Sequence, residues 1–495
     1  MKRVAIIGAG IAGLAAAHRL LERAEEAREP LEILILEAGS LLGGIIKTEE
    51  REGFLLERGP DSFTTEKPEA LELARRLGLE SHLLPTNETH RRSFIVRGAR
   101  LIPVPQGFHL IAPTRFWPFI NSEIMSWSGK ARMALDLVLP RRNTNGATDE
   151  SLAQFIRRRL GREALERVAQ PMVGGIYTAD PERLSLQATM PRFIELERKH
   201  RSIIRALRKE KWGSSPTPAG QLGWDDAARK GAESQVRGAR YSLFASFDRG
   251  MQVLVDRLAA KLATIGIALR TPVTSVKLDR TSMQWRVRAE RGSAITVDAV
   301  CLAVPAYTAA SLLAQTDVLL SAGLNHIPYE STATINLAYR RADIPHRLDG
   351  FGFVVPVIEK RSLMACTFSS VKFTGRAPQD CALLRAFVGG ALQPELVELD
   401  EAELLARVRA DLRVLLGVES APLFSQISKW RKSMPQYEIG HIERVNKIAE
   451  RVAYLPGLAL AGNAYSGVGI PDCIRSGETA ADSLFNTIHT ERVNS

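Results

Sequence analysis

Three glycines near the start of the chain stand at a spacing that suits the binding of a dinucleotide. Gly8, Gly10 and Gly13 form G-x-G-x-x-G directly after the apolar run VAII. In such a turn the first glycine allows a tight bend, the second lets the backbone approach a pyrophosphate, and the third lets the next helix pack closely on the strand. The N-terminus of that helix offers free N–H groups and partial positive charge to the phosphates. The spacing therefore predicts a phosphate-binding turn.

A carboxylate stands where such a site needs an acceptor for ribose hydroxyls. Glu37 ends the apolar run LEILILE, 24 residues after Gly13, against about 20 in the usual pattern. The charged loop EEAREP accounts for the excess. Gly43 and Gly44 follow, and residues 45–58 favour a short hairpin, whereas an ordinary NAD-binding unit continues into another helix and strand.

These residues need a parallel sheet to position them. Residues 4–7 and 31–37 are predicted buried strands, and residues 14–23, which are strong helix formers, are the predicted helix between them. This βαβ unit predicts an α/β fold with helices on the faces of the sheet. The remaining expected segments are helices over 150–210, 251–265 and 400–416, strands near 267–276, 284–290 and within 328–391, and a loop over 213–223.

The end of the chain has the pattern of a strand, a glycine loop and a helix. The strand leads to Gly462 and Asn463, and the helix begins near Pro471. Proline suits a first helical turn because its missing N–H has no partner there. The positive end of this helix would point at whatever binds beside it.

The composition is that of an ordinary folded protein. The 495 residues are 45% hydrophobic and 24% charged, which excludes a disordered, collagen-like or coiled-coil chain. The chain contains no apolar run of about 18 residues, and the run before Gly8 is too short for a signal peptide. The four cysteines form no C-x-x-C pair, so we expect neither a disulfide scaffold nor a zinc ribbon, and we expect a cytoplasmic location.

The formal net charge of +11 is concentrated in two stretches. Residues 91–142 carry a local +7 and residues 192–211 a local +5. Localised positive charge attracts an anionic partner. The stretches have no groove-reading motif, so nucleic acid is not expected. One candidate partner for the positive charge is an anionic membrane surface that would contact residues 107–127, where Trp117 and Phe119 lie. A second candidate is a polycarboxylate substrate. For residues 192–211 the alternative is a charged face that is simply exposed to solvent.

Family resemblance becomes specific beyond the first glycines. The run EAGSLLGG at 37–44 resembles the E-A-x-x-x-x-G-G element of flavin amine oxidases, which bind FAD, although Leu41 stands where those relatives usually carry Arg. From about residue 3 to about residue 488 the chain is similar to protoporphyrinogen/coproporphyrinogen oxidases. The stretches that carry this resemblance are ERGPDSF, residues 171–207, SFDRGMQVLVDRLA, KWRKSMPQYEIGH and GVGIPDCIRSGE.

The resemblance implies an FAD enzyme that aromatises a porphyrinogen. Hydride leaves a bridging carbon for the flavin, and dioxygen takes the electrons and gives hydrogen peroxide. The cofactor carries the hard step, so no catalytic side chain and no metal are expected. The implied partners are the porphyrinogen, dioxygen, a peripheral membrane surface at the inner face of the membrane, and other enzymes of heme biosynthesis.

The resemblance also assigns site residues. FAD contacts are expected from Gly8, Gly10, Gly13, Glu37, Gly43, Gly44, Val273, Trp430, Gly462, Asn463, Val468, Gly469 and Ile470, with Tyr437 as a second aromatic edge. Substrate contacts are expected from Arg92, a loop at Gly174, Gly175 and Ile176 whose carbonyls meet pyrrole N–H groups, and apolar walls at Phe351, Val354 and Phe387. The alternatives are a plain turn for the glycines and core packing for the aromatic residues. The anchor position of relatives acting on protoporphyrinogen aligns with Ser93, one residue after Arg92.

The expected architecture is a Rossmann-like FAD-binding domain built from discontinuous segments, a mixed α+β substrate domain and a helical domain. The segments are 1–80, 221–306 and 441–495 for FAD, 81–102 and 307–440 for substrate, and 103–220 for the helical domain, which is a candidate membrane-facing part. Two alternative functions stay open, because a fold does not fix a function. One is an amine oxidase or carotenoid desaturase of the same superfamily, and the other is a flavoprotein that binds tetrapyrrole without turnover.

Overall fold

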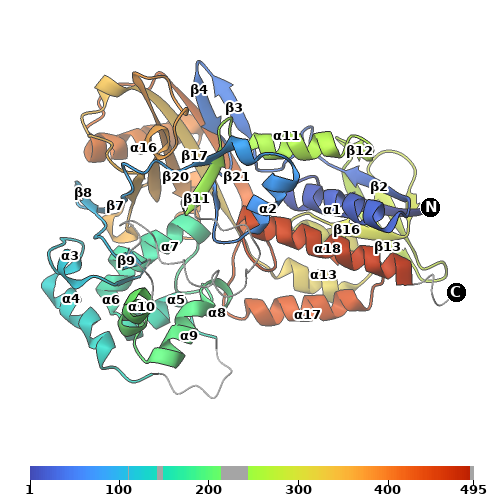
Figure 1. Ribbon diagram of the computed structural model, residues 1–495, viewed down its shortest axis with the longest axis horizontal. Coiled ribbons are helices and arrows are strands. Elements are labelled where there is room, and N and C mark those ends of the chain that lie inside the picture. Colours follow the sequence, from blue (N-terminus) through green and yellow to red (C-terminus); the bar gives the residue numbers. More distant parts are fainter. Residues whose placement is uncertain (110, 142–148, 213–242, 491–495) are drawn as a thin grey trace.

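The computed structural model describes residues 1–109, 111–141, 149–212 and 243–490, and Figure 1 shows their arrangement. A five-stranded parallel sheet, in the order β12-β2-β1-β16-β22, draws its strands from the start, the middle and the end of the chain. Its strands are β1 (Lys2–Ile7), β2 (Leu31–Leu36), β12 (Gly266–Ala268), β16 (Ala299–Leu302) and β22 (Leu458–Leu460). The sequence-based prediction of an α/β fold with a discontinuous dinucleotide-binding unit is confirmed.

Alternate residues of β1 serve two different layers. Val4 and Ile6 pack with α1 (Ile11–Ala27), α18 (Ile470–Thr490) and α11 (Gln252–Lys261). Ala5 and Ile7 face the opposite layer. That layer contains α12 (Ala306–Leu313), α13 (Val318–Asn325) and the antiparallel strands β13 (Val273–Asp279), β14 (Gln284–Ala289) and β15 (Ile295–Val297). Burial on both faces explains why the central strands are apolar throughout.

Helices α1 and α18 lie side by side along one face of this sheet (Figure 1). Their backbones touch at Gly477, where a Cβ would lie 2.1 Å from the carbonyl oxygen of Ala12. Helix α1 is longer than predicted, because it continues through Ala27 into the expected EEAREP loop and ends at Arg28 in the left-handed conformation. The predicted hairpin is present as β3 (Thr48–Arg51) and β4 (Phe54–Glu57).

A second, seven-stranded sheet has the order β21-β17-β20-β19-β18-β7-β8. Its strands are β7 (Phe94–Arg97), β8 (Arg100–Pro103), β17 (Tyr329–Arg340), β18 (Gly352–Val354), β19 (Ala365–Phe368), β20 (Cys381–Gly389) and β21 (Phe424–Pro435). Ile335 and Leu384 pack with the apolar stripe of α16 (Glu401–Leu416). Thr334 and Arg385, on the opposite face, line a large cavity that borders the first sheet.

The described residues of 108–109, 111–141 and 149–212 form the helical part at the lower left of Figure 1, as expected for 150–210. Its elements are the strands β9 (Phe108–His109) and β10 (Ala112–Pro113) and the helices α3 (Phe116–Ile120), α4 (Trp127–Ala134), α5 (Leu152–Arg159), α6 (Arg162–Ala164), α7 (Gln170–Tyr177), α8 (Leu186–Thr189), α9 (Pro191–His200) and α10 (Ile203–Trp212). The predicted loop at 213–223 lies outside the described residues.

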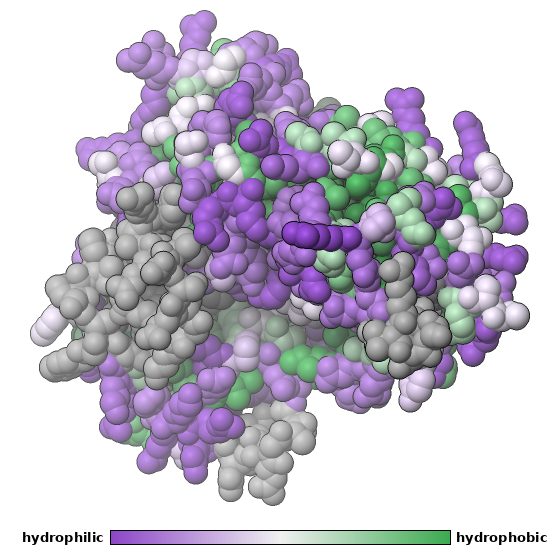
Figure 2. Space-filling model, turned by 45° about the vertical axis from the view of Figure 1, so that its right-hand side comes forward, coloured by the Kyte–Doolittle hydropathy of each residue, from purple (hydrophilic) through white to green (hydrophobic). Residues whose placement is uncertain are grey.

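Smaller elements complete the fold. They are the strands β5 (Phe63–Thr64), β6 (Leu83–Pro85) and β11 (Phe244–Phe247), which form one sheet, and the helices α2 (Glu69–Arg76), α14 (Ser369–Lys372), α15 (Glu395–Glu398) and α17 (His441–Ala453). On the face shown in Figure 2 the surface is mostly hydrophilic, with apolar residues in smaller groups.

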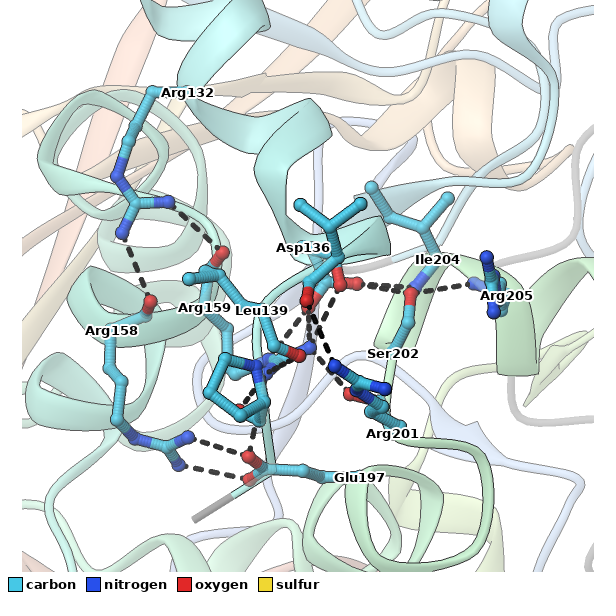
Figure 3. A network of polar contacts seen from close by, with 12 residues as sticks. Arg132, Asp136, Leu139, Arg158, Arg159, Glu197, Arg201, Ser202, Ile204 and Arg205 are labelled. Carbon is cyan, nitrogen blue, oxygen red and sulfur yellow. Dashed lines mark hydrogen bonds and ion pairs between the residues drawn. The ribbon is translucent and has the colours of Figure 1, made fainter.

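A buried ion pair joins the helices of the helical part (Figure 3). Neither the Asp136 nor the Arg159 side chain is exposed to solvent. Arg159 Nε donates to Asp136 Oδ1 at 2.7 Å, and the other carboxylate oxygen accepts from Ser202 Oγ at 2.6 Å and from the Ile204 N–H at 3.0 Å. One carboxylate therefore connects α5 to the start of α10, and its removal would leave the guanidinium with Glu197, 3.7 Å from Arg159 Nη1 and shared with Arg158, as its counter-charge.

We predict that Asp136→Asn lowers the free energy of unfolding by about 3–5 kcal/mol, since it breaks a fully buried pair and leaves the Arg159 guanidinium with the more distant Glu197, which Arg158 shares. Urea denaturation followed by circular dichroism measures the change. The control is Glu166→Gln, which removes the partner of the exposed Arg162 and should shift the midpoint little. Equal shifts in the two variants would contradict the assignment.

Candidate functional site

A single large cavity lies between the two sheets. Its volume is about 1980 Å³, whereas pockets for one drug-sized ligand hold roughly 300–1,000 Å³. Gly8 and Gly10 lie at one part of its wall, and Phe351 and Phe387 at another. The cavity therefore has room for a dinucleotide and a second large molecule, and its walls differ in chemistry from place to place.

The glycine turn after β1 has the geometry that the sequence predicted. Gly8 has φ +99°, and a Cβ there would lie 2.5 Å from the carbonyl oxygen of Ala303. A Cβ on Gly13 would lie 2.0 Å from the carbonyl oxygen of Gly8, so this glycine serves helix packing and does not line the cavity. Gly10 precedes α1 with no side-chain cap, and a Cβ there would meet no protein atom within 4 Å. The turn therefore leaves open space in front of the positive end of α1.

Glu37 holds the turn together at the end of β2. One carboxylate oxygen accepts from the Ala9 N–H at 2.7 Å and the other from the Gly39 N–H at 2.6 Å. The side chain also lines the cavity, and a carboxylate keeps lone pairs for further donors. Gly43 donates its N–H to the Ala9 carbonyl at 2.8 Å, which lays the second glycine pair against the first turn. Gly43, Gly44 and Val273 all line the cavity.

The C-terminal segment meets the same cavity beyond β22, the strand at the far end of the sheet order. Gly462, Asn463, Val468, Gly469 and Ile470 line it, and α18 begins at Ile470, next to Pro471, as the sequence predicted. Gly462 has φ +127°, which a glycine adopts without strain. The N-terminus of α18 therefore adds a second positive helix end to the site.

The two expected aromatic edges have different positions. Trp430 lines the cavity, and its Nε1 donates to the Arg58 carbonyl at 3.0 Å. Tyr437 is buried away from the cavity, so its expected place at the flavin edge is wrong. Its hydroxyl donates to the Asn463 carbonyl at 2.6 Å and accepts from the Gly467 N–H at 2.7 Å, and its ring stacks on His441. Tyr437 thus positions the 463–467 loop.

The apolar walls expected for the substrate do line the cavity: Phe351, Val354 and Phe387. The expected loop at Gly174 and Gly175 is wrong, because both residues lie inside α7, which begins at a proline-containing first turn. The Gly174 carbonyl accepts the Thr178 N–H at 2.9 Å, so it is engaged within the helix.

The two glycines of α7 face different spaces. Gly174 lines a separate small cavity of about 20 Å³, room for about one water molecule. Gly175 and Ile176 line the large one, and a Cβ on Gly175 would lie 4.0 Å from Val354.

Arg92, the expected carboxylate anchor, lines the cavity but already has a partner. Its Nε donates to the Asp349 carbonyl at 2.6 Å, and its guanidinium pairs with the Asp349 carboxylate. Arg91 and Arg100 also line the cavity, as does Ser93. This arrangement lowers the free positive charge that Arg92 itself offers to a ligand.

Sequence reasoning used ERGPDSF only as a family stretch and missed that residues 59–62 of the segment 57–62 line the cavity. Side chains of the seven-stranded sheet hold its backbone carbonyls: Thr334 Oγ1 donates to Arg58 at 2.8 Å, and Asn336 Nδ2 to Glu57 at 3.0 Å. The guanidinium of Arg385 donates to the Gly59 carbonyl. The sequence did contain a signal for this contact, namely the alternation of polar and apolar residues in ATINLAY. Its polar residues Thr334 and Asn336 hold the segment, and its apolar residues Ile335 and Leu337 pack with α16.

Among the described residues no group of three or more His, Cys, Asp or Glu side chains is placed to hold a metal ion. All four cysteines lie in this part of the chain and are free thiols. The site is therefore built from backbone turns, helix ends, apolar walls and basic side chains.

We predict that Gly10→Ala and Gly13→Ala separate ligand binding from folding. The new Cβ of Gly10→Ala meets no protein atom, so the ligand-free melting temperature should hold while the affinity for ADP falls at least tenfold. Gly13→Ala forces a backbone clash and should lose about 1–3 kcal/mol of stability. Calorimetric titration and thermal denaturation measure both, and loss of stability in Gly10→Ala alone would contradict the assignment.

Comparisons with known proteins agree with this geometry. The coproporphyrinogen III oxidase of Bacillus subtilis (strain 168) is 34% identical over 98% of each chain. Protoporphyrinogen oxidase 2 of Arabidopsis thaliana is 28% identical over 99% of this chain and 95% of its own. A crystal structure from Exiguobacterium sp. 255-15, provisionally named a protoporphyrinogen oxidase, superposes with a TM-score of 0.83 at 30% identity, covering 98% of both chains.

More distant solved structures share the fold. A reduced UDP-galactopyranose mutase has a TM-score of 0.70 at 16% identity, covering 98% of this chain and 94% of its own. The family model described as flavin containing amine oxidoreductase matches residues 11–484, which is nearly the whole chain. With the two glycine turns, Glu37 and the α18 terminus on one cavity, the match identifies the chain as a member of the flavin-containing amine oxidoreductase family.

Proposed function

We propose that the protein is an FAD-dependent oxidase that converts a porphyrinogen to the porphyrin in heme biosynthesis, with coproporphyrinogen III as the favoured substrate. The observation that carries the proposal is one continuous cavity with a dinucleotide cradle and an apolar, aromatic wall. The relatives named coproporphyrinogen III oxidase, at 30–34% identity over nearly the whole chain, support the substrate class.

The residues present fit FAD. Gly10 leaves room for a pyrophosphate, Glu37 faces the same space for a ribose, and Gly469 and Ile470 bring the start of α18 to the cavity. When bound, FAD supplies the hydride-accepting ring. The α18 end favours negative charge near it.

The chain's own side chains position the substrate and exclude water. Phe351, Val354 and Phe387 offer an apolar surface to a flat macrocycle, and Gly175 leaves space against Val354. Arg91 and Arg100 also stand at the cavity wall, each in an ion pair with an exposed carboxylate, Glu88 and Glu123 respectively, which a carboxylate arm would have to share or displace. We propose dioxygen as the final electron acceptor, with hydrogen peroxide as its product.

We predict that the purified holoenzyme oxidises coproporphyrinogen III faster than protoporphyrinogen IX. Without air, each substrate should bleach the flavin absorbance once; with air, porphyrin fluorescence and peroxide should accumulate continuously. The FAD-free protein is the control. No oxidation above the spontaneous rate would overturn the proposal, and turnover of an amine or a carotenoid precursor instead would favour another oxidoreductase of the family.

A peripheral membrane contact is a second part of the proposal. Among the described residues no helix is long and apolar enough to cross a bilayer. The helical part exposes two large aromatic side chains, Trp117 at 76% and Trp127 at 71%, and Lys130 Nζ lies 4.6 Å from the Trp127 ring centroid. Phe119, expected to share this surface, is only 4% exposed and packs against Phe108, so its expected role is wrong. Lys130 itself is buried and donates to the carbonyls of Ile120 and Ser122, so the positive charge on this surface comes from the exposed Arg115. Exposed tryptophan with arginine suits the interface of an anionic bilayer.

We predict that the double variant Trp117→Ser, Trp127→Ser lowers co-sedimentation with phosphatidylglycerol vesicles several-fold, since both apolar anchors are lost. Tyr454→Ser, which removes an equally exposed aromatic side chain elsewhere, is the matched control and should bind vesicles like the parent. A parent protein that sediments equally with and without vesicles would end the membrane proposal.

A further inference from the structure

A cluster of buried charges stands in the cavity wall between segment 57–62 and the seven-stranded sheet. Asp61 accepts hydrogen bonds from Lys372 Nζ at 3.1 Å and 3.0 Å, one to each carboxylate oxygen. The Arg385 Nη1 lies 3.8 Å from Asp61 Oδ2. Asp61, Lys372 and Arg385 all line the cavity. One carboxylate is thus shared by two cations.

The surrounding buried groups do not cancel the surplus. Arg376 bonds Ser246 Oγ and the carbonyl oxygens of Asp248 and Phe247. Burial raises the pKa of Glu57 to about 6, so it is ionised only above that pH. Above that pH, Asp61 and Glu57 offset two of the three cations Lys372, Arg376 and Arg385. A further carboxylate, Asp248, faces Arg376 but is half-exposed and bonded to His82, so the surplus within the wall stays with Lys372 and Arg385.

The state of Asp61 is set by its neighbours. Burial alone would raise the pKa of Asp61, but Lys372 and Arg385 together hold it below the usual range. Asp61 therefore stays ionised. As an anion it offsets one of its two cations, Lys372 and Arg385, and leaves one positive charge for a second anion to offset.

Arg385 has donor capacity that the described chain does not use. Its side chain is 4% exposed, and its Nε is buried without a hydrogen-bond partner. Its guanidinium lies 4.9 Å from the ring centroid of Phe387, which belongs to the apolar wall. A buried guanidinium with an unused donor and a surplus charge suits an ionised planar acceptor, since Arg pairs with carboxylates through fixed, parallel donors.

We infer that Arg385 and Lys372, held by Asp61, form an internal carboxylate-binding site of the cavity, and that this site takes one carboxylate arm of the substrate. The inference rests on the proposed function, because it says where an arm of that substrate binds. It also explains how the cavity can anchor an acidic macrocycle although Arg92 is paired with Asp349. The site lies in the buried wall, whereas Arg92 is half-exposed.

The test uses the FAD-loaded protein and two stable probes, coproporphyrin III and its tetramethyl ester. In Lys372→Met and Arg385→Met the dissociation constant for the acid should rise about 10- to 100-fold, as expected for the loss of a charged hydrogen bond. The constant for the ester should change less than twofold. Arg431→Met, which removes an exposed cation paired with Glu398 at the same cavity, is the control and should leave both constants within twofold.

Folding is followed by thermal denaturation and flavin content. If Arg385→Met does not fold, Lys372→Met still tests the inference. In Lys372→Met the hydrogen bond from Arg385 to the Gly59 carbonyl is kept, so the wall should stay folded. Unchanged acid binding in Lys372→Met overturns the inference. The inference is also overturned if Lys372→Met lowers the flavin midpoint potential but binds the acid normally. That result would mean that the cations stabilise the negative charge of the reduced flavin.

The two proposals fail in different ways. A parent that binds coproporphyrin with the predicted variant pattern but oxidises no porphyrinogen contradicts only the proposed function. A parent that oxidises porphyrinogens while Lys372→Met binds the acid normally contradicts only the carboxylate site. A parent that binds neither probe and oxidises no porphyrinogen contradicts both.

Discussion

The site depends on the pairing of β16 with β1 on one side and β22 on the other. Val4 lies opposite Ala299, and Val300 lies opposite Leu458, so three segments from distant parts of the chain run parallel in one sheet. The carboxyl ends of parallel strands meet at one edge, which is where open α/β sheets bind ligands. Gly8 follows β1, residues 303–305 follow β16 and Gly462 follows β22, and all of them line the cavity. The loops can contribute to one binding site only because this strand pairing brings them together.

Close backbone packing fixes the angle at which α1 meets that edge. The Cβ positions of Gly13 and Gly477 are blocked by backbone oxygens of Gly8 and Ala12. A side chain at either place would push α1 from the strand or from α18, and would move the helix N-terminus from the phosphates. Gly10 differs in kind, because its open side faces ligand space. Glycines of one motif thus meet two separate demands, one from packing and one from binding.

The sequence was most informative where function is local. The glycine turn, Glu37 and the start of α18 each depend on a few consecutive residues, and the structure has all of them at the predicted strand and helix ends. The resemblance placed Phe351, Val354 and Phe387, which do share one wall. It misplaced Gly174, because a glycine pair favours a loop in isolation while burial of Val173 and its neighbours favours the helix. The exposure of Phe119 was predicted wrongly for a related reason. Two aromatic residues close together in sequence, Trp117 and Phe119, do not show which of them is buried and which is exposed.

The charge cluster shows what no local pattern could reveal. Asp61 and Lys372 are separated by 311 residues along the chain, and they meet only because segment 57–62 lies across the seven-stranded sheet. Strand β20, which holds the Gly59 carbonyl through Arg385, directs Arg385 and Phe387 to the cavity and Leu384 and Ala386 to α16, and Lys372 lies at the end of the short helix α14. A buried surplus of positive charge is costly without an anion, yet removing the guanidinium would release the Gly59 carbonyl. The strand alternation that builds the wall therefore places its charge beside the apolar surface, where an acidic macrocycle can meet both.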